Sequence, residues 1–295
     1  MALKDFIKSA RPRQWTKNLL VFAGLIFAGK FTDPNAILIA TLTFFAFCFT
    51  SSAGYIFNDI LDKEADKLHP EKRERPIASG RLRVGHAAIF AFSIFILGYV
   101  IAWLAHRNAV LSLGLYTFNQ LFYSIVARRV AILDVFIIAF GFLIRAAAGA
   151  VVLDVTISKW LLLCTLLLAL FLGYAKRRHE LEFAMESRSS LGGYTLPLLD
   201  QLIAISAAAS VISYCLYAIS SQTAFSHPLL VLTIPFPIFG VFRYMAIIYY
   251  DKLSGNPDVA LLKDPWLIGT VLLFLIVSLY AMSQEGWGFL SPWTT

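Results

Sequence analysis

The sequence predicts an all-α integral membrane protein whose helices form one bundle across the bilayer. Of its 295 residues, 59% are apolar and only 15% are charged, whereas a soluble domain is about half apolar and about a quarter charged. The mean hydropathy is +0.72. The apolar residues also gather into runs close to the roughly 20 residues that a membrane-spanning helix needs. These observations exclude an ordinary soluble fold.

Nine such runs follow one another and predict nine transmembrane helices in a single domain covering residues 1–295. The first run is short and contains Gly24 and Gly29. Pro235 and Pro237 are expected to kink the eighth helix, because a proline inside a helix removes a hydrogen bond and clashes with the preceding turn. The runs are 18–32, 35–57, 86–106, 109–127, 131–153, 159–175, 201–221, 228–250 and 265–284.

The basic residues predict the orientation of this bundle. With the N-terminus in the cytoplasm, only three of the 25 Lys and Arg residues fall on the opposite side (Lys30, Arg107 and Lys159), and Arg145 lies inside a span. Cytoplasmic loops of membrane proteins carry an excess of Lys and Arg. We therefore expect a multi-pass protein of the plasma (inner) membrane with a cytoplasmic N-terminus. The net charge of +7 then reflects membrane sidedness and does not indicate nucleic-acid binding.

Three aspartates at the end of the second run form the strongest candidate for a chemical site. Asp59, Asp62 and Asp66 have the spacing that places side chains on one face of a helix, and Asn58 lies beside them. Their mutual repulsion is relieved by a divalent cation, and Mg²⁺ binds a few carboxylates together with water and phosphate oxygens. The stripe therefore predicts a site for Mg²⁺ and a diphosphate. The alternative is a solvated helix end paired with Lys63, Lys67 and Arg73.

The loop that follows presents basic side chains between Pro70 and Pro76. Lys72, Arg73 and Arg75 lie in it, and guanidinium groups match phosphate geometry well. A solvated loop is the alternative for each arginine. Acidic and basic residues gather together on the predicted cytoplasmic side, so we expect a charged cytoplasmic cap that contains the site.

The segment 58–80, NDILDKEADKLHPEKRERPIASG, resembles the first aspartate-rich motif of the UbiA superfamily of intramembrane prenyltransferases. The nine-helix fold of that superfamily also matches the number of runs. Four further segments are similar to the branch of the superfamily that transfers phosphoribose to a polyprenyl phosphate. They are RPRQWTKN (11–18), YSIVARRVAILD (123–134), YAKRRHEL (174–181) and LLKDPW (261–266).

The third of these segments departs from the common pattern of the superfamily. Ordinary members resemble one another there in a second DxxxD magnesium motif, whereas this chain has Lys176, Arg177 and Glu180. The exchange removes a metal site and supplies cationic ligands for phosphate. A donor with a separate 5-phosphate fits this change better than a prenyl diphosphate does.

The resemblance implies a Mg²⁺-dependent enzyme that transfers the 5-phosphoribosyl group of phosphoribosyl pyrophosphate to a polyprenyl (decaprenyl-like) phosphate. It also implies release of pyrophosphate and a role in cell wall precursor biosynthesis. The implied catalytic residues are Asp59, Asp62, Asp66 and Glu180, and the implied metal ligands are Asn58, Asp59, Asp62 and Asp66. The implied substrate contacts are Lys17, Asn58, Lys72, Arg73, Arg75, Tyr123, Arg128, Lys176, Arg177, Arg188, Tyr194 and Lys263. The expected partners are the two substrates and membrane lipid, and a homo-oligomer is left open.

Two other functions compete with this interpretation. A conventional prenyltransferase joins a prenyl diphosphate to an aromatic acceptor, and the missing second DxxxD motif argues against it. A transporter is expected to carry ionisable residues at mid-bilayer in paired broken helices. Here the charges gather at the cytoplasmic ends of the runs.

Overall fold

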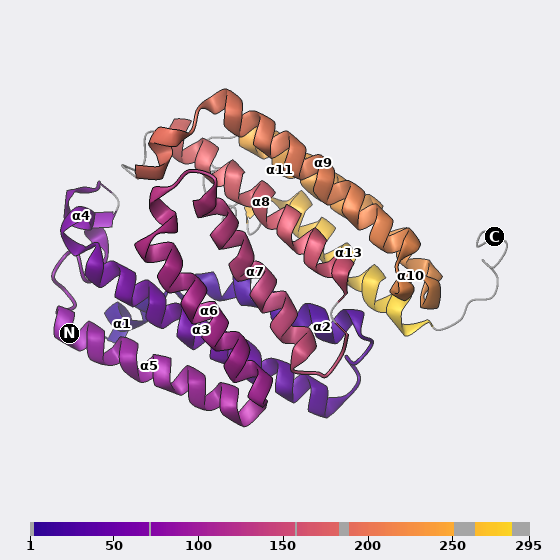
Figure 1. Ribbon diagram of the computed structural model, residues 1–295, viewed down its shortest axis with the longest axis horizontal. Helices are drawn as coiled ribbons and strands as arrows, with labels where there is room; N and C mark the ends of the chain where they lie inside the picture. The colour runs from indigo at the N-terminus through magenta and orange to yellow at the C-terminus, as the bar shows by residue number, and fades with distance from the viewer. Residues whose placement is uncertain (1–2, 71, 157, 183–188, 251–262, 285–295) are drawn as a thin grey trace. The chain divides into compact units, whose positions relative to one another are not determined.

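The computed structural model describes residues 3–70, 72–156, 158–182, 189–250 and 263–284, and the regular structure in these ranges is helical (Figure 1). The chain divides into two compact units. Unit 1 comprises Met1–Leu25, Lys30–Ser124 and Ile144–Thr156, and unit 2 comprises Ile26–Gly29, Ile125–Leu143 and Ile157–Thr295. The single domain over 1–295 stays a prediction.

Eight helices in the described ranges are long and apolar enough to cross a membrane, which confirms an all-helical multi-pass protein. Each corresponds to one of the predicted runs. They are α3 (Pro34–Leu61), α5 (Val84–Ala105), α6 (Arg107–Ile125) followed by the 3-10 helix η3 (Ala127–Arg129), α7 (Leu133–Val151), α8 (Lys159–Glu182), α9 (Leu196–Ser220), the 3-10 helix η5 (Pro228–Thr233) continued by α11 (Pro235–Tyr250), and α13 (Pro265–Ser283).

The first predicted run, 18–32, does not form one long helix, so the count of nine is not confirmed. The chain there forms the 3-10 helix η1 (Pro12–Val21) and the short α2 (Phe22–Phe27). Gly29 follows with a positive φ of 67°, a conformation that ends helices. The apolar run thus predicted a helical segment, whereas the glycine limited its length.

η1 nevertheless runs antiparallel to α3 within unit 1. Near the start of η1, Trp15 Nε1 donates to Ser52 Oγ over 3.0 Å. Further along, the ring of Phe22 lies 5.5 Å from the ring of Phe44, between centroids. The chain thus passes along α3 in short helical pieces.

The N-terminal helix and the loop after α3 lie at the same end of unit 1. α1 (Leu3–Ala10) packs on α3, and α3 packs along α5 (Figure 1). Arg81 Nε lies 3.4 Å from Asp5 Oδ1, which ties the loop to α1. The loop itself contains the short helices α4 (Lys63–Leu68) and η2 (Lys72–Glu74).

A guanidinium group lies buried within unit 1. Arg145 of α7 is 5% exposed. Its Nε donates to Asn18 Oδ1 (2.7 Å) and its Nη2 donates to the Tyr116 hydroxyl (2.7 Å), while its Cζ lies 4.5 Å from the centre of the Tyr116 ring. Gln120 Nε2 donates to the same hydroxyl (2.8 Å). Polar and aromatic groups of the protein thus surround this cation, as expected for an ionisable residue in a membrane span.

Unit 2 is built on two helix pairs. α8 packs along α9, and α11 packs against α13 (Figure 1). The 3-10 helix η4 (Ser189–Gly193) precedes α9, and α10 (Gln222–Ser226) follows it. Pro235 is the first residue of α11, and one residue separates it from the end of η5. The predicted interruption of the 228–250 run therefore occurs at this proline.

Candidate active site

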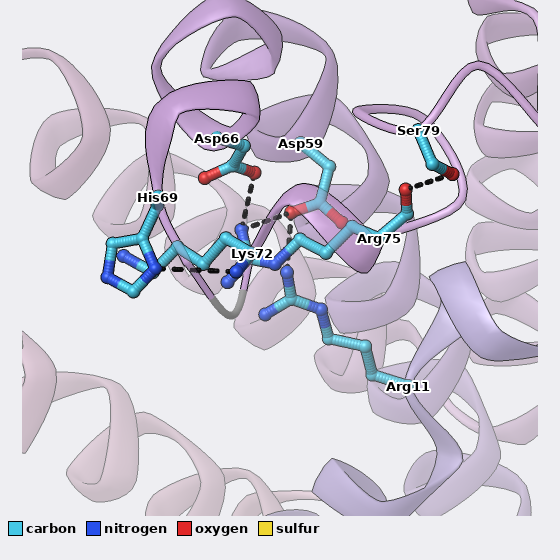
Figure 2. Close-up of polar contacts among 7 residues, drawn as sticks. All are labelled: Arg11, Asp59, Asp66, His69, Lys72, Arg75 and Ser79. Atoms are coloured by element: carbon cyan, nitrogen blue, oxygen red, sulfur yellow. Dashed lines mark hydrogen bonds and ion pairs between the residues drawn. The ribbon is translucent and has the colours of Figure 1, made fainter.

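Two buried aspartates at the ends of α3 and α4 share one guanidinium group (Figure 2). Asp59 is 3% exposed and Asp66 is 5% exposed. Arg75 Nη1 lies 3.1 Å from Asp59 Oδ1 and 2.7 Å from Asp66 Oδ2. Arg11 Nη2 lies 2.5 Å from Asp59 Oδ1. We call these four side chains the aspartate–arginine cluster.

Asp62 lies where α3 ends and α4 begins, so the three aspartates are not on one continuous helix. Its backbone has φ −91° and ψ 9°. Helical hydrogen bonding continues across the break, because the Asp66 N–H donates to the Asp62 carbonyl (2.8 Å). Asp62 is half-buried. The structure therefore brings Asp59 and Asp66 together, and the role of Asp62 as a metal ligand stays a prediction.

Asp59 and Asp66 pair with Arg11 and Arg75. The cations weighed from the sequence were Lys63, Lys67 and Arg73. Lys67 pairs with Glu64 instead, at 2.8 Å. Arg11 was not among the predicted site residues, although it opens the RPRQWTKN segment. It has a positive φ of 50°, which is uncommon for a residue other than glycine, and its guanidinium lies over the ring of Tyr55. The sequence feature that could have indicated Arg11 as a site residue is its position at the start of RPRQWTKN, one of the segments similar to the superfamily.

Local hydrogen bonds hold the loop that carries Arg75 (Figure 2). Ser79 Oγ donates to the Arg75 carbonyl (2.8 Å), and the Lys72 N–H donates to His69 Nδ1 (3.3 Å). Lys72 is half-buried and Arg73 is exposed. Beside the loop, Asn58 Oδ1 accepts the hydroxyl proton of Ser124 (3.0 Å).

A second buried cluster, in unit 2, surrounds Asp134. Arg177 Nε donates to Asp134 Oδ2 (2.8 Å), and Arg177 Nη1 contacts Glu180 Oε2. The hydroxyl of Tyr194 donates to Asp134 Oδ1 (2.7 Å). All four residues are at most 5% exposed. We call them the Asp134 cluster; it contains three predicted site residues and one, Asp134, that was not predicted although it ends the YSIVARRVAILD segment.

Tyr194 stays protonated in this cluster. Burial raises the pKa of its hydroxyl, and the hydrogen bond to the Asp134 carboxylate raises it further. The hydroxyl also accepts the Ile132 N–H over 2.6 Å. Both its hydrogen and an oxygen lone pair are thus used inside the protein.

The other predicted site residues are more exposed or lie outside the described residues. Those that the structure describes are placed on helices of both units, and their roles stay predictions. Lys17 on η1, Tyr123 on α6, Arg128 on η3 and Lys176 on α8 are half-buried, Lys263 before α13 is exposed, and Arg188 lies outside the described residues.

The donor atoms of the aspartate–arginine cluster fit a magnesium ion. The two carboxylates face one position, because the same nitrogen of Arg75 contacts both. Oxygen donors are the ligands that Mg²⁺ takes, and it keeps several waters or phosphate oxygens in addition to one or two carboxylates. Within the described part of the chain, no three His, Cys, Asp or Glu residues are grouped so that they could hold a metal ion. Among the described residues, two buried carboxylates, those of Asp59 and Asp66, thus lie on either side of the Arg75 nitrogen.

A helical membrane bundle with two buried aspartates on α3 and α4 is the arrangement expected above for an intramembrane prenyltransferase. Residues 18–253 match the UbiA prenyltransferase family, and the chain belongs to this family.

Relatives of known name share most of the chain. It is 36% identical over 279 residues to the decaprenyl-phosphate phosphoribosyltransferase of Mycolicibacterium smegmatis, covering 89% of this chain and 87% of the relative. The protein of the same name from Corynebacterium glutamicum is 34% identical, over 88% of this chain and 80% of the relative. Its namesake from Mycobacterium tuberculosis is 33% identical, over 88% and 87%.

Solved structures share the fold. A UbiA homolog from Archaeoglobus fulgidus bound to DMAPP and Mg²⁺ superposes with a TM-score of 0.73 at 19% identity, covering 95% of this chain and 99% of that chain. The apo structure of a UbiA homolog from Aeropyrum pernix K1 gives a TM-score of 0.62 at 15% identity, over 96% and 97%. The predicted family and its helical membrane fold are thereby confirmed, whereas the nine helices and the charged cytoplasmic cap stay predictions.

Proposed function

We propose that this protein transfers the 5-phosphoribosyl group of phosphoribosyl pyrophosphate to a polyprenyl phosphate and releases pyrophosphate. The observation that carries this proposal is the similarity, at 33% to 36% identity over most of the chain, to relatives named decaprenyl-phosphate phosphoribosyltransferase. The Asp134 cluster supports it independently. Where a conventional prenyltransferase is expected to have two metal-binding carboxylates, α8 carries Lys176 and the buried pair Arg177 and Glu180.

The aspartate–arginine cluster is proposed to bind the pyrophosphate of the donor. In the transfer, an oxygen of the lipid phosphate bonds to the anomeric carbon while the bond from that carbon to pyrophosphate breaks, and pyrophosphate leaves with the electron pair. Arg11 and Arg75 provide fixed donors where this negative charge develops. Mg²⁺ held by Asp59, Asp62 and Asp66, beside Asn58, would supply further charge neutralisation.

The cations of α8 are proposed to bind the 5-phosphate of the donor. Asp134 and Glu180 bond to Arg177 and hold its guanidinium in one orientation, and Lys176 adds a half-buried ammonium group in the same turn. Glu180 thus serves to orient a cation. A buried guanidinium held on two sides is pre-organised for phosphate.

The acceptor needs no general base, because a phosphate monoester is anionic at neutral pH and attacks as it stands. Large apolar side chains are exposed along α5 and α6, among them Trp103 and Phe118, as expected for surfaces that contact lipid. The remaining proposed substrate contacts are Lys17, Lys72, Arg73, Tyr123, Arg128, Arg188 and Lys263. Tyr194 is left out of this set, because its hydroxyl already bonds to Ile132 and Asp134.

We also propose that the site faces the cytoplasm from the inner membrane. Arg11 of the N-terminal segment bonds to Asp59 at the end of α3, so the basic N-terminus and the aspartates belong to one end of unit 1. The excess of basic residues on this side supports a cytoplasmic location. A soluble donor such as phosphoribosyl pyrophosphate is available there.

A product assay with purified protein tests the reaction. We expect labelled phosphoribosyl pyrophosphate and decaprenyl phosphate, with MgCl₂, to give a phosphoribosylated lipid and pyrophosphate in equal amounts. A matched reaction offers a prenyl diphosphate and an aromatic acceptor, and an Asp59→Asn variant controls for contaminating enzymes. Product only in the second reaction would replace the proposal by a conventional prenyl transfer.

A further inference from the structure

The turn before α7 contains an isoleucine in a conformation that isoleucine rarely adopts. Ile132 has a positive φ of 71°. Left-handed backbone is costly for a β-branched residue, and such residues persist only where surrounding structure holds them. Its side chain is 42% exposed, so packing of the isoleucine does not explain the conformation.

The hydroxyl of Tyr194 supplies a contact that holds this turn. It accepts the Ile132 N–H (2.6 Å) and donates to Asp134 Oδ1 (2.7 Å), which bridges two points of the turn. Gly193, the residue before Tyr194, also packs tightly against the turn. A Cβ at this position would lie only 2.7 Å from the Cβ of Ala131. The η4 segment is therefore fitted directly onto the turn.

Two proposed substrate cations adjoin this turn. Arg177 is bonded to the other oxygen of Asp134, Oδ2 (2.8 Å), and Arg128 precedes the turn on η3. Relaxation of Ile132 would move Asp134, at the start of α7, and with it the guanidinium of Arg177. The Tyr194 hydroxyl is itself committed to internal partners and is buried.

We propose that Tyr194 is a positioning residue that latches the strained 130–134 turn and thereby fixes Arg177 and Arg128 for the donor. The role of these cations rests on the proposed function, whereas the latch itself does not. Tyr194 thus acts through the turn and makes no substrate contact of its own.

Glycine provides the test, because it adopts a positive φ without strain. We expect Tyr194→Phe to lower kcat/KM for phosphoribosyl pyrophosphate by about 5- to 150-fold, the population change equivalent to a strain of about 1–3 kcal/mol. Adding Ile132→Gly to this variant should restore most of the loss. Adding Ile132→Ala should restore less, because alanine loses the β-branch but keeps a Cβ, which disfavours a positive φ.

Greater rescue by glycine than by alanine supports the latch, and no rescue or equal rescue by the two residues overturns it. If Tyr194→Phe does not fold, recovery of folded protein in the glycine double variant but not in the alanine one is read in the same way. Hydrogen exchange gives a readout independent of activity: the Ile132 amide should exchange faster in Tyr194→Phe than in wild type, and an unchanged rate would overturn the latch. Failure of the proposed function would instead appear as no phosphoribosyl transfer by the wild type.

Discussion

Replacing Arg75 by Gln removes the guanidinium shared by Asp59 and Asp66 and leaves two buried carboxylates facing each other. The Arg75 nitrogen lies 3.1 Å from one carboxylate oxygen and 2.7 Å from the other. These oxygens are therefore no more than about 6 Å apart, and two unit charges at that separation repel by about 3 kcal/mol at an effective dielectric constant of about 20. Arg11 remains on Asp59 and offsets part of the loss.

Thermal unfolding in detergent, followed by tryptophan fluorescence, measures this effect. At about 2–4 °C per kcal/mol, the full repulsion corresponds to a fall of the unfolding midpoint on the order of 6–12 °C. Because Arg11 offsets part of it, Arg75→Gln in EDTA should unfold below the wild type by up to this amount. Because a divalent cation bound by both carboxylates replaces the lost charge, MgCl₂ should raise the midpoint of the variant more than that of the wild type.

Arg83→Gln is the matched control, since Arg83 is an exposed cation of the same connection. Its midpoint should change by only about 1–2 °C, as for most surface substitutions. Equal midpoints for the two variants would show that the shared guanidinium does not stabilise the aspartates. An equal response of both to MgCl₂ would refute binding of the ion between them.

Asp59→Asn should lower turnover roughly a hundredfold or more, equivalent to a loss of about 3 kcal/mol in transition-state stabilisation. The elution volume of the folded protein should stay unchanged. Near-normal turnover would contradict the catalytic role of this carboxylate. A cysteine at Ser79, in a chain whose native cysteines are replaced, should resist an impermeant thiol reagent in sealed cells and react once the membrane is opened; labelling from outside would invert the orientation. The hydrogen bond from Arg243 holds the pKa of Asp264 below its usual value. The pair therefore stabilises the fold at pH values above the unfolded pKa of about 3.9. This stabilisation is lost as the pH falls through the lower pKa of the folded state. The unfolding midpoint of the wild type should therefore fall more steeply in acid than that of Asp264→Asn. Parallel pH profiles of the two proteins would contradict a stabilising role of this pair.

The long helices could be predicted because span length and apolar composition are local properties of the chain. Each of the eight described spans matches an apolar run. The 18–32 run met the same criterion, yet it forms η1 and α2. Hydropathy indicates burial, whereas the choice between one long helix and short pieces depends on glycine geometry and on packing against α3.

The candidate site was predictable only in part, since its contacts join residues far apart in sequence. Helical spacing brought Asp59 and Asp66 to one place, but the break at Asp62 is not visible in that spacing. The partners Arg11 and Asp59 are 48 residues apart, and Tyr194 and Asp134 are 60 apart. Such pairs depend on how helices pack. Arg11 is one of several basic residues near the N-terminus. All of them are explained by membrane orientation, so the sequence does not single out Arg11 as the partner of Asp59.

The buried guanidinium of Arg145 has a consequence for the order of biosynthesis. A cation at the centre of a membrane helix costs about 2.5–3.5 kcal/mol during insertion, and here Asn18 and Tyr116 receive its hydrogen bonds. Both residues precede Arg145 in the chain, so the ribosome has made them before α7 emerges. The hydrogen-bond acceptors of Arg145 are therefore available when α7 is inserted, whereas a circular permutant that begins at α7 would present Arg145 to the translocon before these acceptors exist.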